Sequence, residues 1–155
     1  MSRKYDSGSS LQEKILKGVE VLTDNVASTL GPCGRNVILH QKGCSPIITK
    51  DGVTISKFIE LEDPFENAGA QIIKQVAART AEECGDGTTT SIVLAQAVLR
   101  EAQKYIVAGS SPVEMKRGMD KAVKAIVGQL ESLARPISSV EDIEHIATIS
   151  ANGDE

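Results

Sequence analysis

The residues best suited to chemistry lie in one short segment, Gly85-Asp86-Gly87-Thr88-Thr89-Thr90. Two glycines flank a carboxylate, and three hydroxyl side chains follow at a predicted helix start. Glycine lets the backbone approach a ligand, and a helix N-terminus offers unpaired amides and a positive dipole end. These groups suit a phosphate chain, with Asp86 as a ligand for the Mg²⁺ of a nucleotide. The alternative is that Asp86 only caps the helix.

Two further segments combine turn residues with charge. Thr29-Leu30-Gly31-Pro32-Cys33-Gly34-Arg35 is a predicted helix end that runs into a loop. Lys50-Asp51-Gly52 would put a charge pair at a hairpin tip, although the residues alone favour a plain type I′ turn with a solvated lysine. The sequence contains neither GxxxxGK[ST] nor GxGxxG, which argues against a conventional P-loop or Rossmann site.

The cysteines and histidines carry weaker signals. Cys33 and Cys44, with His40 between them, could be metal ligands, but there is no CxxC and no obvious fourth ligand, so ordinary thiols are favoured. With Cys84 the number is odd and the spacing irregular, which predicts a reducing, cytoplasmic location rather than a disulfide framework. His145, like His40, lacks the neighbours of a triad or metal site.

Apolar spacing predicts the helices that position these segments. A first helix is expected over Leu11–Leu30, with Ser9 or Ser10 as its N-cap and Gly31-Pro32 ending it. Its apolar stripe comprises Leu11, Ile15, Val19, Leu22, Val26 and Leu30.

Residues 36–60 read as a small antiparallel β element. Strands are expected over Asn36–His40 and Ile47–Lys50. Asp51-Gly52 is then a hairpin turn, and Val53–Ser56 continues as a strand because polar and apolar residues alternate there.

Two helices follow. Asp63-Pro64 opens the first, which ends at Cys84-Gly85. The second is expected over Thr89–Ala108 with Gly109 as its capping residue. The predicted inward residues are Ala68, Ile72, Ile73, Val76, Ala77 and Thr80 in the first helix, and Ile92, Ala95, Leu99, Ala102 and Ile106 in the second.

The rest of the chain carries two predicted capping boxes. Ser111–Glu114 opens a long helix that Pro136 ends, and Ser138–Glu141 opens a short one to Ala147. Ser150–Glu155 resembles a further helix start, which predicts a piece of a longer protein; a polar tail is the alternative. The inward residues of the long helix are Met115, Met119, Ala122, Val123, Ile126, Leu130 and Leu133.

Composition limits the fold and partners. The 155 residues are 41% hydrophobic, 25% charged and only 3% aromatic, which excludes a disordered chain and favours a mainly α fold of packed aliphatic helices. Few aromatics and a net charge of −4 argue against nucleic-acid binding. With no long apolar run and no signal peptide, no membrane partner is expected.

Five stretches together closely resemble the group I (GroEL-type) chaperonins. They are TLGPCGRNVIL (29–39), ITKDGVTISKFIELEDPFENAGAQIIKQVA (48–77), GDGTTTSIVLAQAV (85–98), SPVEMKRGMDKAV (111–123) and TISANGDE (148–155). Group II chaperonins share GDGTTT, but the TLGPxGRN and SANGDE forms are those of group I. The resemblance implies the N-terminal part of an equatorial ATP-binding domain over residues 1–133 and the start of an intermediate domain over 134–155.

The resemblance also implies activity and partners. Members are ATPases whose identical subunits form sevenfold rings and fold unfolded polypeptides under a GroES-type co-chaperonin lid. The apical domain, the intermediate-domain catalytic acid and the C-terminal half of the nucleotide site have no counterpart in these residues. Weak or absent hydrolysis by this chain alone is therefore expected, and a non-hydrolysing assembly module is the alternative function.

Residue roles follow from the same resemblance. Thr29-Leu30-Gly31-Pro32 lines the nucleotide, Lys50 lies near the phosphates, Asp51 is the catalytic acid beside the attacking water, Asp86 binds Mg²⁺, and Gly87-Thr88-Thr89-Thr90 cradles the phosphates. A K⁺ ion is implied near Thr29 and Lys50. Cys33 stands where the family usually has Lys, and Ser7-Gly8 and Leu11-Gln12 replace its Phe-Gly and Ala-Arg.

Overall fold

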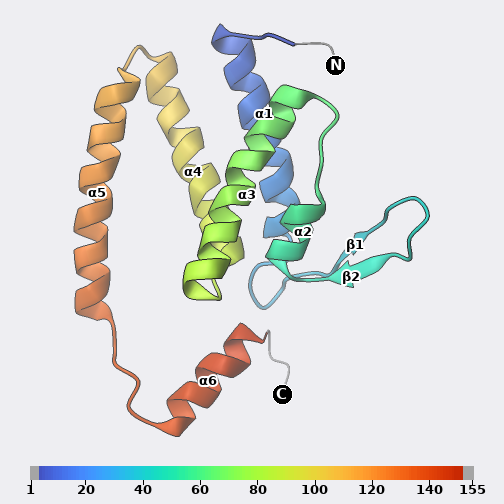
Figure 1. The fold of residues 1–155 in the computed structure, drawn as a ribbon. Helices are drawn as coiled ribbons and strands as arrows, with labels where there is room; N and C mark the ends of the chain where they lie inside the picture. Colours follow the sequence, from blue (N-terminus) through green and yellow to red (C-terminus); the bar gives the residue numbers. More distant parts are fainter. Residues whose placement is uncertain (1–3, 152–155) are drawn as a thin grey trace. The chain divides into compact units, whose positions relative to one another are not determined.

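The computed structural model of the chain describes residues 4–151 and is mainly helical (Figure 1). The helices are α1 (Gly8–Ala27), α2 (Gly52–Phe58), α3 (Pro64–Cys84), α4 (Thr88–Val107), α5 (Pro112–Leu133) and α6 (Val140–Ser150). Strands β1 (Val37–Leu39) and β2 (Ile47–Thr49) pair antiparallel, with Ile38 opposite Ile48. The predicted mainly α fold with a small antiparallel β element is confirmed.

The chain divides at Lys104 into two compact units. The first holds α1, the hairpin, α2, α3 and most of α4, and it contains every predicted site residue. The second holds the end of α4 with α5 and α6. The expected domain boundary after Leu133 is a different division and stays a prediction.

The core of the first unit is aliphatic and draws on five elements. Its buried members are Val19, Leu22, Val26, Leu39, Ile55, Ala70, Ile73, Ala77 and Ile92. Helices α1 and α3 cross so closely that a side chain at Gly18 would overlap the Glu66 backbone oxygen, and one at Gly69 would overlap that of Ile15. The two glycines therefore set the distance between these helices.

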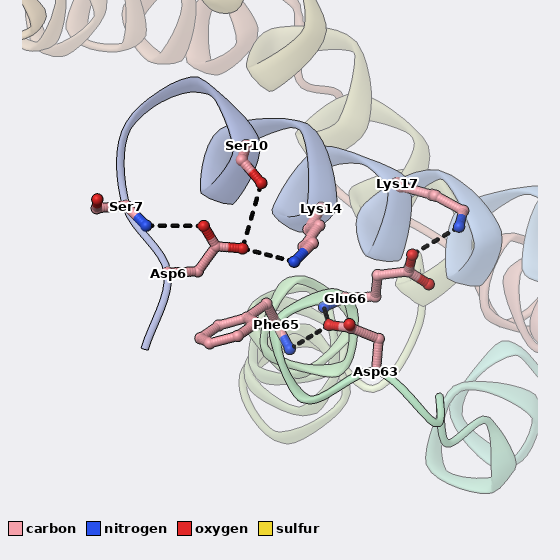
Figure 2. A network of polar contacts seen from close by, with 8 residues as sticks. All are labelled: Asp6, Ser7, Ser10, Lys14, Lys17, Asp63, Phe65 and Glu66. Atoms are coloured by element: carbon pink, nitrogen blue, oxygen red, sulfur yellow. Dashed lines mark hydrogen bonds and ion pairs between the residues drawn. The ribbon is translucent and has the colours of Figure 1, made fainter. Parts of the chain in front are cut away.

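Charged side chains hold the start of α1 against the start of α3 (Figure 2). Lys14 Nζ lies 2.5 Å from the Asp6 carboxylate and 5.2 Å from the centre of the Phe65 ring. Lys17 pairs with Glu66 at 2.6 Å. Asp63 accepts hydrogen bonds from the backbone amides of Phe65 and Glu66, at 2.8 and 3.1 Å, and so caps α3.

The largest error of the sequence prediction concerns residues 51–58. Asp51-Gly52 is not a hairpin turn and Val53–Ser56 is not a strand, because α2 begins at Gly52. The Asp51 side chain accepts hydrogen bonds from the amides of Val53 and Thr54, so it is a helix N-cap. Ile55 then enters the core from a helix.

The first helix is displaced toward the N-terminus. It begins after Ser7, not at Ser9 or Ser10, and it ends at Ala27. The amides of Thr29 and Leu30 instead bond the carbonyls three residues earlier, which tightens the chain into a turn. Leu30 therefore lies outside the helix and is 47% exposed.

The buried face of α3 is also rotated from the predicted one. Ile73 and Ala77 are buried as predicted, but Ala68 and Ile72 are exposed, and Gly69 and Ala70 are buried in their place. A hydrophobicity pattern overlooks Gly69, yet the close approach of α1 at this glycine decides which face points inward.

In the second unit, the helix N-caps and the buried residues differ from those predicted. The box at Ser111 does not form, because its side chain makes no capping bond and Glu114 pairs with Arg117 at 2.7 Å. The second box forms one residue later than predicted, between Ser139 and Asp142, and α6 reaches Ser150. The rest of the predicted terminal helix start, at residues 152–155, lies outside the described residues.

No side chain of α5 is buried among the described residues. Of the seven residues predicted to point inward, only Met115 and Met119 are half-buried. The amphipathic stripe is present in the sequence, but nothing described covers it.

Candidate phosphate-binding site

The loop after α1 is held in a fixed shape by its own backbone. The Gly34 amide donates to the Gly31 carbonyl and the Arg35 amide to the Ser28 carbonyl, both at 2.9 Å. Gly31 has a φ of 76°, which favours glycine. Leu30, Gly31 and Pro32 are exposed on this loop.

Thr29 is the first residue of this segment and is buried, with 8% of it exposed. Its hydroxyl donates to the Val26 carbonyl at 2.7 Å. The oxygen of that hydroxyl keeps lone pairs for a further contact. A cation ligand role at Thr29 is compatible with this chemistry, but the K⁺ ion stays a prediction.

Both carboxylate oxygens of Asp51 accept hydrogen bonds. Its Oδ2 accepts from the Thr54 hydroxyl at 2.6 Å and the Thr54 amide at 2.8 Å, and its Oδ1 accepts from the Val53 amide at 3.3 Å. Burial alone would raise the pKa of Asp51, but these bonds outweigh it and hold the pKa below its ordinary value. The carboxylate is therefore ionised at neutral pH, and Oδ1 is its less saturated oxygen.

Lys50 is exposed between the end of β2 and Asp51. Its position next to the α2 N-cap follows from the chain alone. The predicted charge pair is thus at a helix start and not at a hairpin tip.

The Gly85–Thr90 segment joins α3 to α4 through two glycines with positive φ, 75° at Gly85 and 82° at Gly87. Asp86 is exposed between them and accepts a hydrogen bond from the Gly87 amide at 2.6 Å. Helix α4 begins at Thr88, which is buried, while Thr89 is half-buried and Thr90 exposed. The predicted loop and helix start are confirmed.

The fold brings the separate segments together at Gly52. The position of a β-carbon on Gly52 would lie 2.6 Å from the Thr89 hydroxyl oxygen and 3.2 Å from Val26 Cγ1. The start of α2, the first turn of α4 and the last turn of α1 therefore meet. Since Thr29 bonds to Val26, the three predicted segments converge within the first unit. Gly52 and Thr54 are the site residues that the sequence prediction missed.

The carboxylates near the candidate site can be set against the ligands that Mg²⁺ needs. Within residues 4–151 no group of three or more His, Cys, Asp or Glu side chains could hold a metal ion. Mg²⁺ at nucleotide sites needs only one or two carboxylates together with substrate phosphates and water. The exposed carboxylate of Asp86 beside a helix N-terminus fits that requirement.

The cysteines are free and exposed, at Cys33, Cys44 and Cys84. Cys33 lies in the loop after α1, and Cys84 is the last residue of α3. None of the helices in the described part of the chain is long and apolar enough to cross a membrane.

The family of the chain follows from its match to a known protein family. A model of the TCP-1/cpn60 chaperonin family matches residues 22–155, which includes every residue of the candidate site. The chain belongs to the TCP-1/cpn60 chaperonin family. TCP-1/cpn60 chaperonins assist protein folding, generally hydrolyse ATP and generally form oligomeric rings. The resemblance found in the sequence is thus confirmed at the level of the family.

Proposed function

We propose that this chain is the N-terminal portion of a group I chaperonin subunit and carries the phosphate-binding part of its ATP site. The observation that carries the proposal is the close approach of Gly52 to Thr89. Because Lys50 and Asp51 directly precede Gly52, this approach brings them near the first turn of α4. One ligand could then contact the Lys50 ammonium, the Asp51 carboxylate and the amides of that turn.

Each segment has a role suited to its chemistry. The first-turn amides and hydroxyls of Thr88–Thr90 donate to phosphate oxygens, because a helix N-terminus favours negative charge. Lys50 adds positive charge, and the Thr29–Pro32 loop contacts the rest of the nucleotide. Asp86 holds Mg²⁺, which screens the phosphate charge when bound. A K⁺ ion near Thr29 and Lys50 belongs to the same proposal.

Asp51 is proposed to act on the attacking water. Its carboxylate is ionised, and among the described residues Oδ1 accepts one long hydrogen bond, at 3.3 Å. It therefore accepts a hydrogen bond from water and orients it, and the low pKa limits its strength as a proton acceptor. We expect nucleotide binding to exceed hydrolysis in these 155 residues by themselves.

The wider function follows from the same proposal. The complete subunit would assemble into sevenfold rings in the cytoplasm and enclose unfolded polypeptides under a co-chaperonin lid. In that subunit, the residues described here would supply the phosphate-binding part of the ATP site.

Asp86→Asn tests the proposal, because it removes the charge and keeps the shape of the side chain. Wild-type chain should gain about 2.7 kcal/mol of stability at Mg-ATP concentrations about 100 times Kd. Asp86→Asn should lose most of that gain, whereas Glu20→Gln, the same charge change at an exposed position of α1, should keep it. Thermal unfolding with and without Mg-ATP measures both. Equal melting of all three proteins with and without nucleotide would sink the proposal.

A further inference from the structure

Gly52 is a glycine that its own backbone does not require. It is the first residue of α2 and is not among the glycines with positive φ. Alanine adopts helical backbone more readily than glycine. A reason for glycine must therefore come from the surroundings.

The surroundings supply one reason. A methyl group on Gly52 would lie 2.6 Å from the Thr89 hydroxyl oxygen, closer than any van der Waals contact allows, and 3.2 Å from Val26 Cγ1. It would lie 3.6 Å from the Thr89 amide nitrogen, which is an ordinary contact. The methyl thus conflicts chiefly with one hydroxyl group, and a hydroxyl yields by rotating about χ1.

Other helical glycines do not share this feature. Methyl groups at Gly118 and Gly128 of α5 would meet nothing within 4 Å. Gly18 and Gly69 face backbone atoms, which cannot rotate away. At Gly52, the space that a β-carbon would need is taken by the side-chain oxygen of Thr89, at the candidate phosphate site.

We propose that Gly52 is a positioning residue for ATP binding, because its missing side chain lets the Thr89 hydroxyl stand in the rotamer that faces the phosphates. This inference rests on the proposed function. It adds a residue outside the predicted phosphate donors that decides where one of these donors points.

The experiment compares Gly52→Ala with Gly128→Ala, a helical glycine in open space. Gly52→Ala should turn the Thr89 side chain to another χ1 rotamer, measured by three-bond NMR couplings without nucleotide. It should also weaken Mg-ATP binding about tenfold, the size expected for one lost hydrogen bond to a charged group. Gly128→Ala should change neither quantity.

A double-mutant cycle shows whether the effect passes through Thr89. Thr89→Ala removes the hydroxyl, so adding Gly52→Ala to it should cost no further affinity. An equal loss in both backgrounds, or an unchanged Thr89 rotamer in Gly52→Ala, would overturn the inference. If the wild-type chain binds no Mg-ATP, the proposed function fails, and the rotamer measurement still decides whether Gly52 positions Thr89.

Discussion

Three aspartates do similar work at the starts of three helices. Asp51 and Asp63 are N-caps of α2 and α3, and Asp142 accepts bonds from Ser138 and Ser139 at the start of α6. In each case hydrogen bonds to the carboxylate hold its pKa below the ordinary value. These carboxylates therefore stabilise their helices more when ionised than when protonated.

Asp63 should therefore make the free energy of unfolding fall in acid. The amides of Glu66 and Phe65 lower its pKa in the folded chain. The ionised side chain stabilises the fold above the unfolded pKa of about 3.9, and this stability is lost as pH falls through the folded pKa. Asp63→Asn should lower stability at pH 7 and flatten its decline in acid, measured by urea unfolding at several pH values. Glu62→Gln, an exposed neighbour, should leave the profile as it is.

Thr23 carries the buried side-chain oxygen that lacks a hydrogen-bond partner among the described residues. It is 1% exposed in the core of the first unit. Leaving a hydroxyl unsatisfied costs free energy, so Thr23→Val, which keeps the shape, should raise the free energy of unfolding by about 1 kcal/mol. Thr80→Val is the matched control, because the Thr80 hydroxyl donates to the Val76 carbonyl at 3.0 Å. A gain in both variants, or in neither, would contradict the role given to the missing partner.

Among the elements, the α1–α3 crossing decides how tightly the first unit packs. Gly69→Ala forces a methyl against the Ile15 backbone and should destabilise the chain by about 2 kcal/mol or more. Gly118→Ala should instead be neutral or slightly stabilising, because it gains helix propensity in open space. Chemical unfolding of both variants measures the difference. Similar effects would mean that the helices separate at little cost.

The helices whose ends carry unambiguous signals were predicted well from the sequence. Asp63-Pro64 and Gly85 bound α3 where the structure has them. The hairpin turn predicted at Asp51-Gly52 was wrong. The same dipeptide occurs in hairpin turns and at helix N-termini, and only its hydrogen bonds distinguish the two structures.

The candidate site was predictable as separate motifs and not as an arrangement. GDGTTT alone is compatible with a phosphate loop and equally with a plain helix cap. The meeting of Gly52 with Thr89 depends on how α2 and α4 pack, which no local spacing encodes. The roles carried by the family resemblance stay predictions until nucleotide binding is measured.

At the scale of the whole molecule, the two units differ in how many side chains they bury. The first unit holds all nine buried apolar residues, whereas α5 and α6 bury no side chain among the described residues. Local stability follows buried contacts, so stability should be concentrated in α1 and α3.

Hydrogen exchange of the backbone amides measures this difference directly. Amides of α5 and α6 should exchange faster than those at the centres of α1 and α3. Equal protection in the two units would show that the apolar stripe of α5 is covered in solution. Addition of Mg-ATP should slow exchange chiefly in the first unit, where the candidate site lies.

The glycine-mediated crossing of α1 and α3 also turns the intervening chain into a closed loop of about fifty residues. Loop-closure entropy grows with the logarithm of length, so ten more residues would cost only about 0.2 kcal/mol. Residues 40–46, which join the two strands, are exposed, and Leu39 of β1 is the buried residue of the hairpin. The tip between Lys42 and Gly43 is therefore a permissive insertion point, where a peptide tag or a fluorescent label can be displayed while the crossing stays intact.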